Sequence, residues 1–377
     1  MFDVEKLVRP CILSRREYVP GKPIEEVRRE TGITDLIKVA SNENPLGPSP
    51  LARQAMIAEI RNNSHRYPDS LCYELRNKLA RTHGLSADHF FVDNGEDGVI
   101  TMLGLTFINP GEEAVYGAVT FPAYENITTK MDGVCVPVAM MPDFRLDLQG
   151  FAAALSDRTK IVFICNPNNP TGTMVCQSEL EKLLNATPES VVIVSDEAYC
   201  DFADRAEFPQ TIDLLEEYPN LIVLRTFSKI MGLAGVRVGY AVANPPIIKA
   251  MLKSREPFPV SRPAQAGAAA ALDDTDFLHR TLELTRRGRE QLYSGFEKLG
   301  LRYYRSHTNF VMVDLEVAAL PVFQAMLEQG VIARPLNTFG LPNFLRITVA
   351  TPEENRRTLD VLGRILSMFP RTASNER

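Results

Sequence analysis

Three short apolar segments in the middle of the chain constrain its fold more than any other feature. They cover Ile161–Cys165, residues 191–195 and residues 221–225, so their starting points at 161, 191 and 221 are evenly spaced. Each has the length and the β-branched content of a fully buried strand. The spacing leaves room for a helix between consecutive strands. It therefore predicts right-handed βαβ units and a largely parallel sheet.

A helix signal lies between the first two segments. Ser178 is a candidate N-cap with Glu181 three residues later, and Leu180, Leu183 and Leu184 share one face. The intervening segments share no sequence pattern, so the regular spacing does not indicate a solenoid.

The flanking regions predict an α/β chain with two unequal domains. Before the three segments we expect helices at 68–83 and 98–107 and strands at 113–116 and Val134–Val138. After them we expect helices at 276–299, 319–329 and 351–369 and strands at 310–315 and 344–349, with a frayed end at 372–377. Thr351 is a candidate N-cap, with Pro352 at the first helical position and Glu354 at the third. The expected division is an N-terminal arm (1–45) that joins the smaller domain, a large domain (46–253) and a smaller α+β domain (254–377).

Composition excludes several classes of function. The net charge of -6 comes from interleaved acids and bases without a basic stripe, so we expect no nucleic-acid partner. No apolar run reaches the roughly 18 residues of a membrane helix, and charges in residues 1–10 argue against a signal peptide. The six cysteines are scattered and no histidines cluster, which predicts no metal site and a reducing, cytoplasmic location.

Polar clusters follow all three predicted strands, at the edge where parallel sheets bind ligands. Taken alone, each cluster is typical of an ordinary loop, a helix cap or a surface pair. Their order and spacing together favour a site. The clusters are Asn166-Pro167-Asn168-Asn169-Pro170-Thr171-Gly172, then Asp196-Glu197-Ala198-Tyr199, and then Thr226-Phe227-Ser228-Lys229 with Arg237 eight residues on.

Carbanion stabilisation is the chemistry that needs this set. A lysine amine condenses with an aldehyde cofactor, is displaced by a substrate amine, and then moves a proton. An aspartate keeps the pyridine nitrogen of such a cofactor protonated, so that the ring acts as an electron sink. Tyr and Asn side chains on the phenolic oxygen lower the pKa of the lysine imine, while hydroxyls and an arginine bind the phosphate.

The chain resembles the fold-type-I pyridoxal 5'-phosphate (PLP) aminotransferases, and within them the histidinol-phosphate aminotransferases. The resemblance runs nearly end to end and implies a large domain with a mostly parallel seven-stranded sheet flanked by helices, plus a smaller α+β domain. Besides the clusters above, it is carried by Tyr18-Val19-Pro20-Gly21-Lys22-Pro23, Ala40-Ser41-Asn42-Glu43-Asn44-Pro45, Arg66-Tyr67-Pro68-Asp69, Arg225, Gly232-Leu233-Ala234-Gly235-Val236-Arg237 and Leu345-Arg346-Ile347-Thr348.

The resemblance also implies roles for individual residues. Lys229 would be the Schiff-base lysine and Asp196 the partner of the pyridinium nitrogen. Asn169 and Tyr199 would contact the phenolic oxygen, and Tyr124 would stack on the ring. The phosphate would be held by backbone N–H groups of Glu96 and Asp97, by Thr226, Ser228 and Arg237, and by Tyr67 of a second subunit. A helix opening at residues 95–98 suits an anion. Arg346 would bind the substrate carboxylate or phosphate, helped by Arg334, with Tyr18 and Asn42 nearby.

Some of these roles have structural alternatives. Tyr124 is also explained as a core aromatic, Arg334 as a surface ion pair, Tyr18 as an anchor on the partner subunit, and Tyr67 as a packing residue.

Glu96 departs from the family pattern, because Gly95-Glu96-Asp97-Gly98 stands where Gly-Ser/Ala-Asp-Glu is usual. A carboxylate facing a phosphate unpaired would be costly, since like charges about 4 Å apart repel by several kcal/mol even at an effective dielectric near 20. We expect the side chain to turn to solvent or to a cation and to leave only its N–H on the phosphate. The alternative is a protonated Glu96 that donates a hydrogen bond.

The resemblance implies a homodimer with shared active sites that acts on small-molecule amino donors and keto acceptors. The implied reaction converts L-glutamate and imidazole-acetol phosphate into 2-oxoglutarate and L-histidinol phosphate in two ping-pong halves. Three alternatives remain: transamination of aromatic amino acids, decarboxylation of a threonine-phosphate-type substrate, and a PLP-binding transcription regulator. The regulator would need an additional helix-turn-helix domain, for which the segment before Ile37 is too short. No GxGxxG or P-loop pattern supports a dinucleotide or nucleotide site.

Overall fold

The computed structural model describes residues 2–13, 15, 21–203 and 206–369. Tyr18 and the expected frayed end at 372–377 lie outside the described residues, so the structure does not test them.

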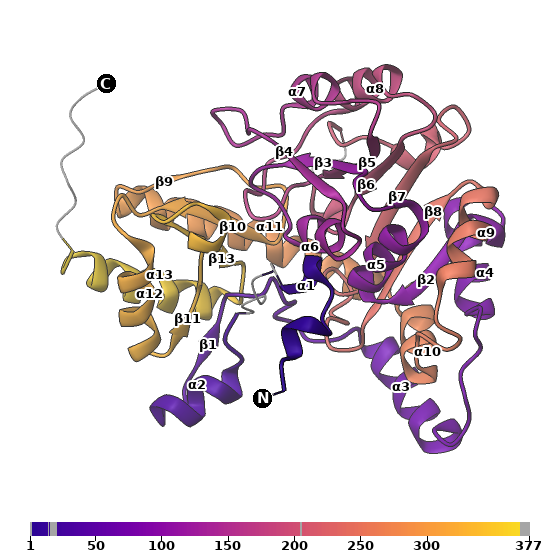
Figure 1. The fold of residues 1–377 in the computed structure, drawn as a ribbon. Coiled ribbons are helices and arrows are strands. Elements are labelled where there is room, and N and C mark those ends of the chain that lie inside the picture. The colour runs from indigo at the N-terminus through magenta and orange to yellow at the C-terminus, as the bar shows by residue number, and fades with distance from the viewer. Residues whose placement is uncertain (1, 14, 16–20, 204–205, 370–377) are drawn as a thin grey trace.

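A seven-stranded sheet forms the centre of the larger part of the molecule (Figure 1). The strand order is β2-β8-β7-β6-β5-β3-β4, and β8 alone runs in the direction opposite to the other six strands. The predicted mostly parallel seven-stranded sheet is therefore confirmed. The strands are β2 (Phe90–Asn94), β3 (Glu113–Gly117), β4 (Val134–Val138), β5 (Thr159–Cys165), β6 (Val192–Asp196), β7 (Leu221–Thr226) and β8 (Val238–Ala243).

Helices cover both faces of this sheet because its strands are apolar on both sides. Along β5, Ile161, Phe163 and Cys165 join one core cluster, whereas Val162 and Ile164 join another. The first cluster includes apolar residues of α5 (Gly95–Phe107), α6 (Ala123–Lys130) and α9 (Pro245–Ser254). The second includes those of α3 (Pro50–Asn63), α4 (Tyr73–His83), α7 (Leu148–Ala153), α8 (Gln177–Ala186) and α10 (Arg262–Ala271).

Three helix starts differ from the predictions. The N-cap of α8 is Cys176 and not Ser178, because the Glu179 carboxylate accepts the Cys176 N–H at 2.9 Å and closes a capping box two residues earlier. Helix α4 begins at Tyr73, since Cys72 has a positive φ of 52° and interrupts the expected helix from 68. Helix α5 begins at Gly95, three residues before the predicted start.

The smaller part is built around a four-stranded antiparallel sheet of order β12-β13-β10-β9. Its strands are β9 (Arg302–Tyr303), β10 (Phe310–Asp314), β12 (Arg334–Pro335) and β13 (Phe344–Thr348), and its helices are α12 (Ala319–Glu328) and α13 (Pro352–Leu366). The predicted cap of α13 is confirmed, because the Thr351 hydroxyl accepts the Glu354 N–H at 3.3 Å.

The N-terminal segment packs on this smaller part. Strand β1 (Ile37–Lys38) pairs in parallel with β11 (Val331–Ile332), and Val27 of α2 (Ile24–Thr31) packs against Leu327. Helix α1 (Pro10–Leu13) contacts α6 of the larger part. Short 3-10 helices cover Val4–Lys6, Ala87–His89, Cys200–Phe202, Thr211–Leu214 and Asn337–Phe339.

Helix α11 (Thr275–Lys298) joins the two cores. Leu278 and Leu282 pack on the core of the large sheet, whereas Leu292 and Phe296 belong to the core of the smaller part. Helix α10, beyond the expected boundary at 253, packs mainly on α3.

Within the described ranges, no helix has the length and apolar character needed to span a membrane.

Candidate active site

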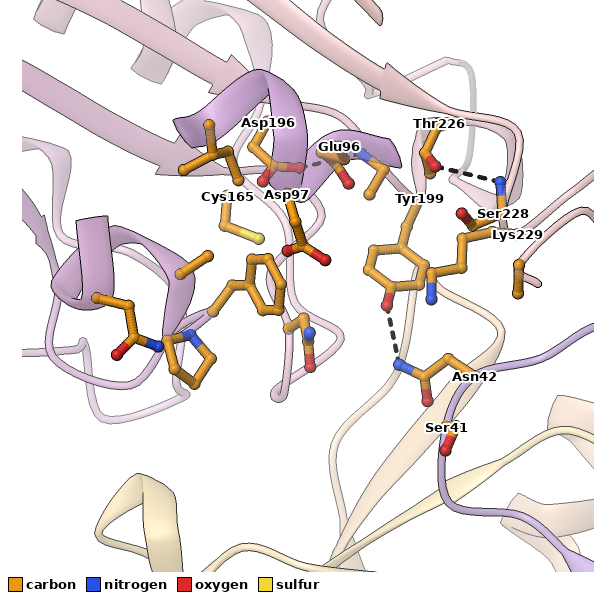
Figure 2. Close-up of a pocket in the computed structure, with 18 of the residues that line it drawn as sticks. Ser41, Asn42, Glu96, Asp97, Cys165, Asp196, Tyr199, Thr226, Ser228 and Lys229 are labelled. Atoms are coloured by element: carbon orange, nitrogen blue, oxygen red, sulfur yellow. Dashed lines mark hydrogen bonds between the residues drawn. The ribbon is translucent and has the colours of Figure 1, made fainter. Parts of the chain in front are cut away.

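A cavity of about 470 Å³ lies between the large sheet and the smaller part (Figure 2). It brings together most of the predicted site residues. We call those from the carboxyl ends of β6 and β7 (Asp196, Tyr199, Thr226, Ser228 and Lys229) the cofactor wall. We call Asn42, Arg334 and Arg346 the substrate wall. The other predicted residues that line the cavity are Asn169, Glu96, Asp97 and Arg237.

Lys229 follows β7 and places its ammonium group 5.6 Å from the centroid of the Tyr199 ring. Burial lowers the pKa of Lys229 to about 8, and the positive charge of Arg346 acts in the same direction. A lysine with this pKa is partly a free amine near neutral pH, as a nucleophile must be.

Asp196 ends β6 and is almost fully buried. Its Oδ2 accepts the Tyr124 hydroxyl at 2.5 Å, and its Oδ1 accepts the Ala198 N–H at 3.2 Å. Burial raises the pKa of Asp196, and these two donors oppose that rise by stabilising the carboxylate. Asp196 is therefore held in a fixed orientation at the cavity.

The predicted stacking role of Tyr124 is wrong. Its fully buried ring stacks on Phe163 with centroids 4.7 Å apart, and the residue does not line the cavity. Tyr124 is a core aromatic whose hydroxyl reaches Asp196. Phe121, which follows β3 and does line the cavity, is the aromatic residue that sequence reasoning missed. The rule that ligands bind beyond strand ends could have found it.

An anion-binding cup lies at the N-terminus of α5. Arg237 donates to Ser228 Oγ at 3.4 Å and forms an ion pair with Asp97 at 3.2 Å. The Ser228 N–H is bonded to Thr226 Oγ1 at 3.1 Å. Gly95 has a φ of 71°, and a Cβ there would collide with the Arg237 guanidinium. The cup thus offers helix N–H groups, hydroxyls and a guanidinium to a phosphate.

The expected outward orientation of Glu96 is wrong. Its carboxyl group lies within the cavity beside that of Asp196, and its Oε1 is buried. Figure 2 shows the two side chains side by side above Tyr199. Burial, followed by the charge of Asp196, raises the pKa of Glu96 well above its ordinary value.

The substrate wall presents two arginines on adjacent strands. Arg346 of β13 and Arg334 of β12 are partners in register, and both line the cavity. Arg346 is buried and donates to Asn169 Oδ1 at 2.5 Å and to the Ala40 carbonyl at 2.7 Å. Asn42 donates to the Tyr199 hydroxyl at 2.9 Å, and so connects the two walls.

Tyr67 does not line this cavity. It is 79% exposed, and its ring stacks on Phe258 with centroids 4.8 Å apart. Among residues that the sequence did not single out, Arg15 and Asn126 lie at the cavity and are joined by a 2.5 Å hydrogen bond.

These residues fit pyridoxal phosphate. The half-buried amine of Lys229, the buried carboxylate of Asp196 and the anion cup match the aldehyde, ring nitrogen and phosphate of that cofactor. In the part of the chain that the structure describes, no cluster of three or more His, Cys, Asp or Glu could hold a metal.

The chain belongs to the aminotransferase class I and II family, whose sequence model matches residues 34–362. More particularly, it is similar to the histidinol-phosphate aminotransferases of Moorella thermoacetica and Brevibacillus brevis. The Moorella protein is 46% identical, and the match covers 95% of this chain and 93% of that protein. The Brevibacillus protein is 44% identical, and the match covers 94% of this chain and 97% of that protein. The crystal structure of the Sinorhizobium meliloti histidinol-phosphate aminotransferase with pyridoxal-5'-phosphate superposes with a TM-score of 0.87. Its sequence is 29% identical to this one, and the superposition covers 96% of this chain and 98% of the Sinorhizobium chain.

Proposed function

We propose that this chain is a PLP-dependent histidinol-phosphate aminotransferase. It would catalyse the reversible reaction of L-histidinol phosphate and 2-oxoglutarate to imidazole-acetol phosphate and L-glutamate, a step of histidine biosynthesis. The observation that carries the proposal is the half-buried Lys229 and the buried Asp196 beside an anion cup, in a chain whose relatives share this activity over nearly their whole length.

The bound cofactor supplies an electron sink for the carbanion left when the substrate carbon loses its proton. Lys229 would take that proton from the substrate carbon and return it to the cofactor. A pKa of about 8 suits a group that must both accept and donate a proton near neutral pH. Asp196 would keep a proton on the ring nitrogen, because a negative carboxylate next to that nitrogen stabilises its protonated, positively charged form. Tyr199, oriented by Asn42, is available to the phenolic oxygen.

Arg346 is the proposed anion receptor for both substrates. A guanidinium presents a planar fork that matches carboxylate and phosphate equally well. Its hydrogen bonds to Asn169 and Ala40 fix the plane of that fork before substrate arrives. Arg334, its partner in register, would take the remaining charge of a phosphate dianion.

We also propose a homodimer in which Tyr67 completes the partner's phosphate cup. Support comes from the position of Tyr67, exposed and outside its own cavity. Exposed apolar side chains on the neighbouring segments also favour a covered face; they include Leu51, Ile57, Ile60, Leu71 and Phe258. Five cysteines that form no disulfide, Cys72, Cys135, Cys165, Cys176 and Cys200, support a reducing, cytoplasmic location.

A panel of half-reactions tests the substrate. PLP-loaded enzyme is mixed separately with histidinol phosphate, glutamate, phenylalanine and threonine phosphate, and loss of the visible absorbance of the lysine-bound cofactor is followed. We expect conversion with histidinol phosphate and glutamate. Faster conversion with phenylalanine would favour an aromatic aminotransferase. Release of CO2 from threonine phosphate would favour a decarboxylase.

Mixing two inactive variants tests the shared site. Lys229→Ala and Tyr67→Ala subunits are unfolded together and refolded, because a hybrid dimer contains one site with both residues intact. We expect activity above that of either parent refolded alone. A mixture no more active than the parents, with hybrids shown by native mass spectrometry, would exclude sharing through Tyr67.

A further inference from the structure

Glu96 occupies an unusual position for an acidic side chain. It lies in the first turn of α5, where its backbone is held against β8, since a Cβ on Gly239 would collide with the Glu96 N–H. From there its carboxyl group enters the cavity beside Asp196. Its Oε1 is buried and receives no hydrogen bond from any group in the described part of the chain.

Glu96 has no ion-pair partner among the described residues, and Arg237 is already engaged with Asp97, Ser228 and the Ala234 carbonyl. The charge of Lys229 lowers the pKa of Glu96, but burial and the charges of Asp196 and Asp97 raise it by more. The titratable groups that interact electrostatically with Glu96 include Asp97, Asp196, Lys229, Tyr199, Cys165 and Cys200.

Glu96 and Asp196 lie side by side in a cavity where burial raises the pKa of both carboxyl groups. Two such groups repel each other when both are ionised, so one of them carries a proton. Asp196 already receives two hydrogen bonds, from Tyr124 and Ala198, which stabilise its carboxylate. Glu96 Oε1 receives none. The proton therefore belongs on Glu96, which becomes a donor toward Asp196.

We propose that Glu96 is protonated in the native protein and donates a hydrogen bond to Asp196, so that it acts as a positioning residue for the carboxylate that partners the ring nitrogen. A neutral Glu96 also removes the conflict between an acid and the phosphate cup, because only its backbone N–H then faces the phosphate. The inference depends on the proposed function only through the role of Asp196.

Infrared spectroscopy tests the proton directly. Difference spectra of the wild type and Glu96→Gln, recorded at neutral pH with and without PLP, should show that the variant loses the carbonyl stretch of one protonated carboxylic acid. Asp97→Asn, the adjacent acid that pairs with Arg237, should retain that band. If Glu96→Gln loses no such band, Glu96 is ionised and the proposal fails. This result is independent of the substrate panel, so the two proposals can fail separately.

The pH profile of kcat separates positioning from packing. Glutamine keeps a donor toward Asp196, whereas serine is too short to reach it. We expect Glu96→Ser to lower kcat about tenfold, the effect of one hydrogen bond to a charged group, and Glu96→Gln to retain nearly full kcat. Since the pKa of Glu96 is raised, its donor is present at low pH and is lost as pH rises through that pKa. The kcat of the wild type should therefore fall at high pH, whereas the kcat of Glu96→Gln should not. Equal behaviour of Gln and Ser variants, or parallel profiles of Gln variant and wild type, would overturn the positioning role.

Discussion

The cofactor wall and the substrate wall differ in how the chain builds them. The cofactor wall comes from adjacent strands of one parallel sheet, β6 and β7, whose carboxyl ends meet at one edge. The substrate wall combines Asn42 with Arg334 and Arg346, some 300 residues away in sequence, on an antiparallel sheet. One wall follows from a local rule of sheet topology, and the other depends on tertiary packing.

The walls also differ in charge. The cofactor wall contains Asp196, which lies beside Glu96, and a lysine whose pKa is lowered, whereas the substrate wall presents two guanidinium groups. Chemistry on the first wall needs charges that change, and binding on the second needs charges that are permanent. Variants on the cofactor wall should therefore affect the chemical step most, and those on the substrate wall should affect recognition.

The largest effect is expected for Lys229→Ala. Removing the amine removes both the covalent link and the proton carrier, so we expect activity to fall by about 10⁴-fold or more. Borohydride reduction of the PLP-loaded variant should leave no cofactor covalently attached, while PLP remains bound in the cavity. Lys249→Ala, an exposed lysine on α9, is the matched control and should keep full labelling. Covalent label on another lysine in Lys229→Ala would disprove the assignment.

Asp196→Asn should have the next largest effect. The amide keeps the shape of the side chain and removes the charge that holds the ring nitrogen protonated. We expect kcat to fall at least about 100-fold, which is roughly 2.7 kcal/mol of barrier, with PLP still bound. Asp213→Asn, an exposed acid on the same domain, serves as the control. Turnover near that of the wild type in Asp196→Asn would mean that another group protonates the ring.

The contrast between the walls explains what the sequence could predict. Asp196, Lys229 and Asn169 follow strands recognisable from their apolar runs, so the topology rule places them together. The sheet prediction missed β2 and β8, although it included the strands that carry these residues. The antiparallel β8 lies within the sheet at a position that periodicity alone does not reveal.

The errors concern side-chain directions. Tyr124 and Phe121 both follow β3 three residues apart, and only packing against Phe163 decides which ring is buried. For Glu96, the cost of placing an unpaired carboxylate against a phosphate suggested a side chain turned to solvent or to a cation. The closeness of β8 to its backbone instead directs the carboxyl inward, and that contact is tertiary. The substrate-wall residues were found through family resemblance, because no local pattern links residues so far apart.

Arg346→Lys tests the substrate wall. An ammonium group cannot reproduce the guanidinium fork, so the glutamate and histidinol-phosphate half-reactions should both slow, by about 10- to 100-fold. Arg334→Lys should affect the phosphate substrate more than glutamate, because it supplements Arg346. Single-turnover kinetics of each half-reaction measure both effects. A defect of Arg346→Lys confined to one half would assign the other anion to Arg334.

The smallest effect tests whether the two walls act independently. Arg346 lowers the pKa of Lys229 across the cavity, in addition to the larger contribution of burial. Replacing it with glutamine removes that positive charge, so the pKa of Lys229 should rise from about 8 toward its ordinary value. Less free amine would then be present at neutral pH. The pH dependence of amine modification at Lys229, followed by mass spectrometry of the PLP-free protein, measures the change.

Arg334→Gln is the control for this measurement, since Arg334 is not among the main contributors to the pKa of Lys229. The midpoint of modification should rise in Arg346→Gln and stay unchanged in Arg334→Gln. Added salt should reduce the difference only partly, because Arg346 is buried and Lys229 is half-buried, and salt screens such groups less than exposed ones. An unchanged midpoint in Arg346→Gln would show that burial alone sets the pKa of Lys229. The substrate wall would then bind anions without influencing the amine, and the electrostatic link between the walls would not exist.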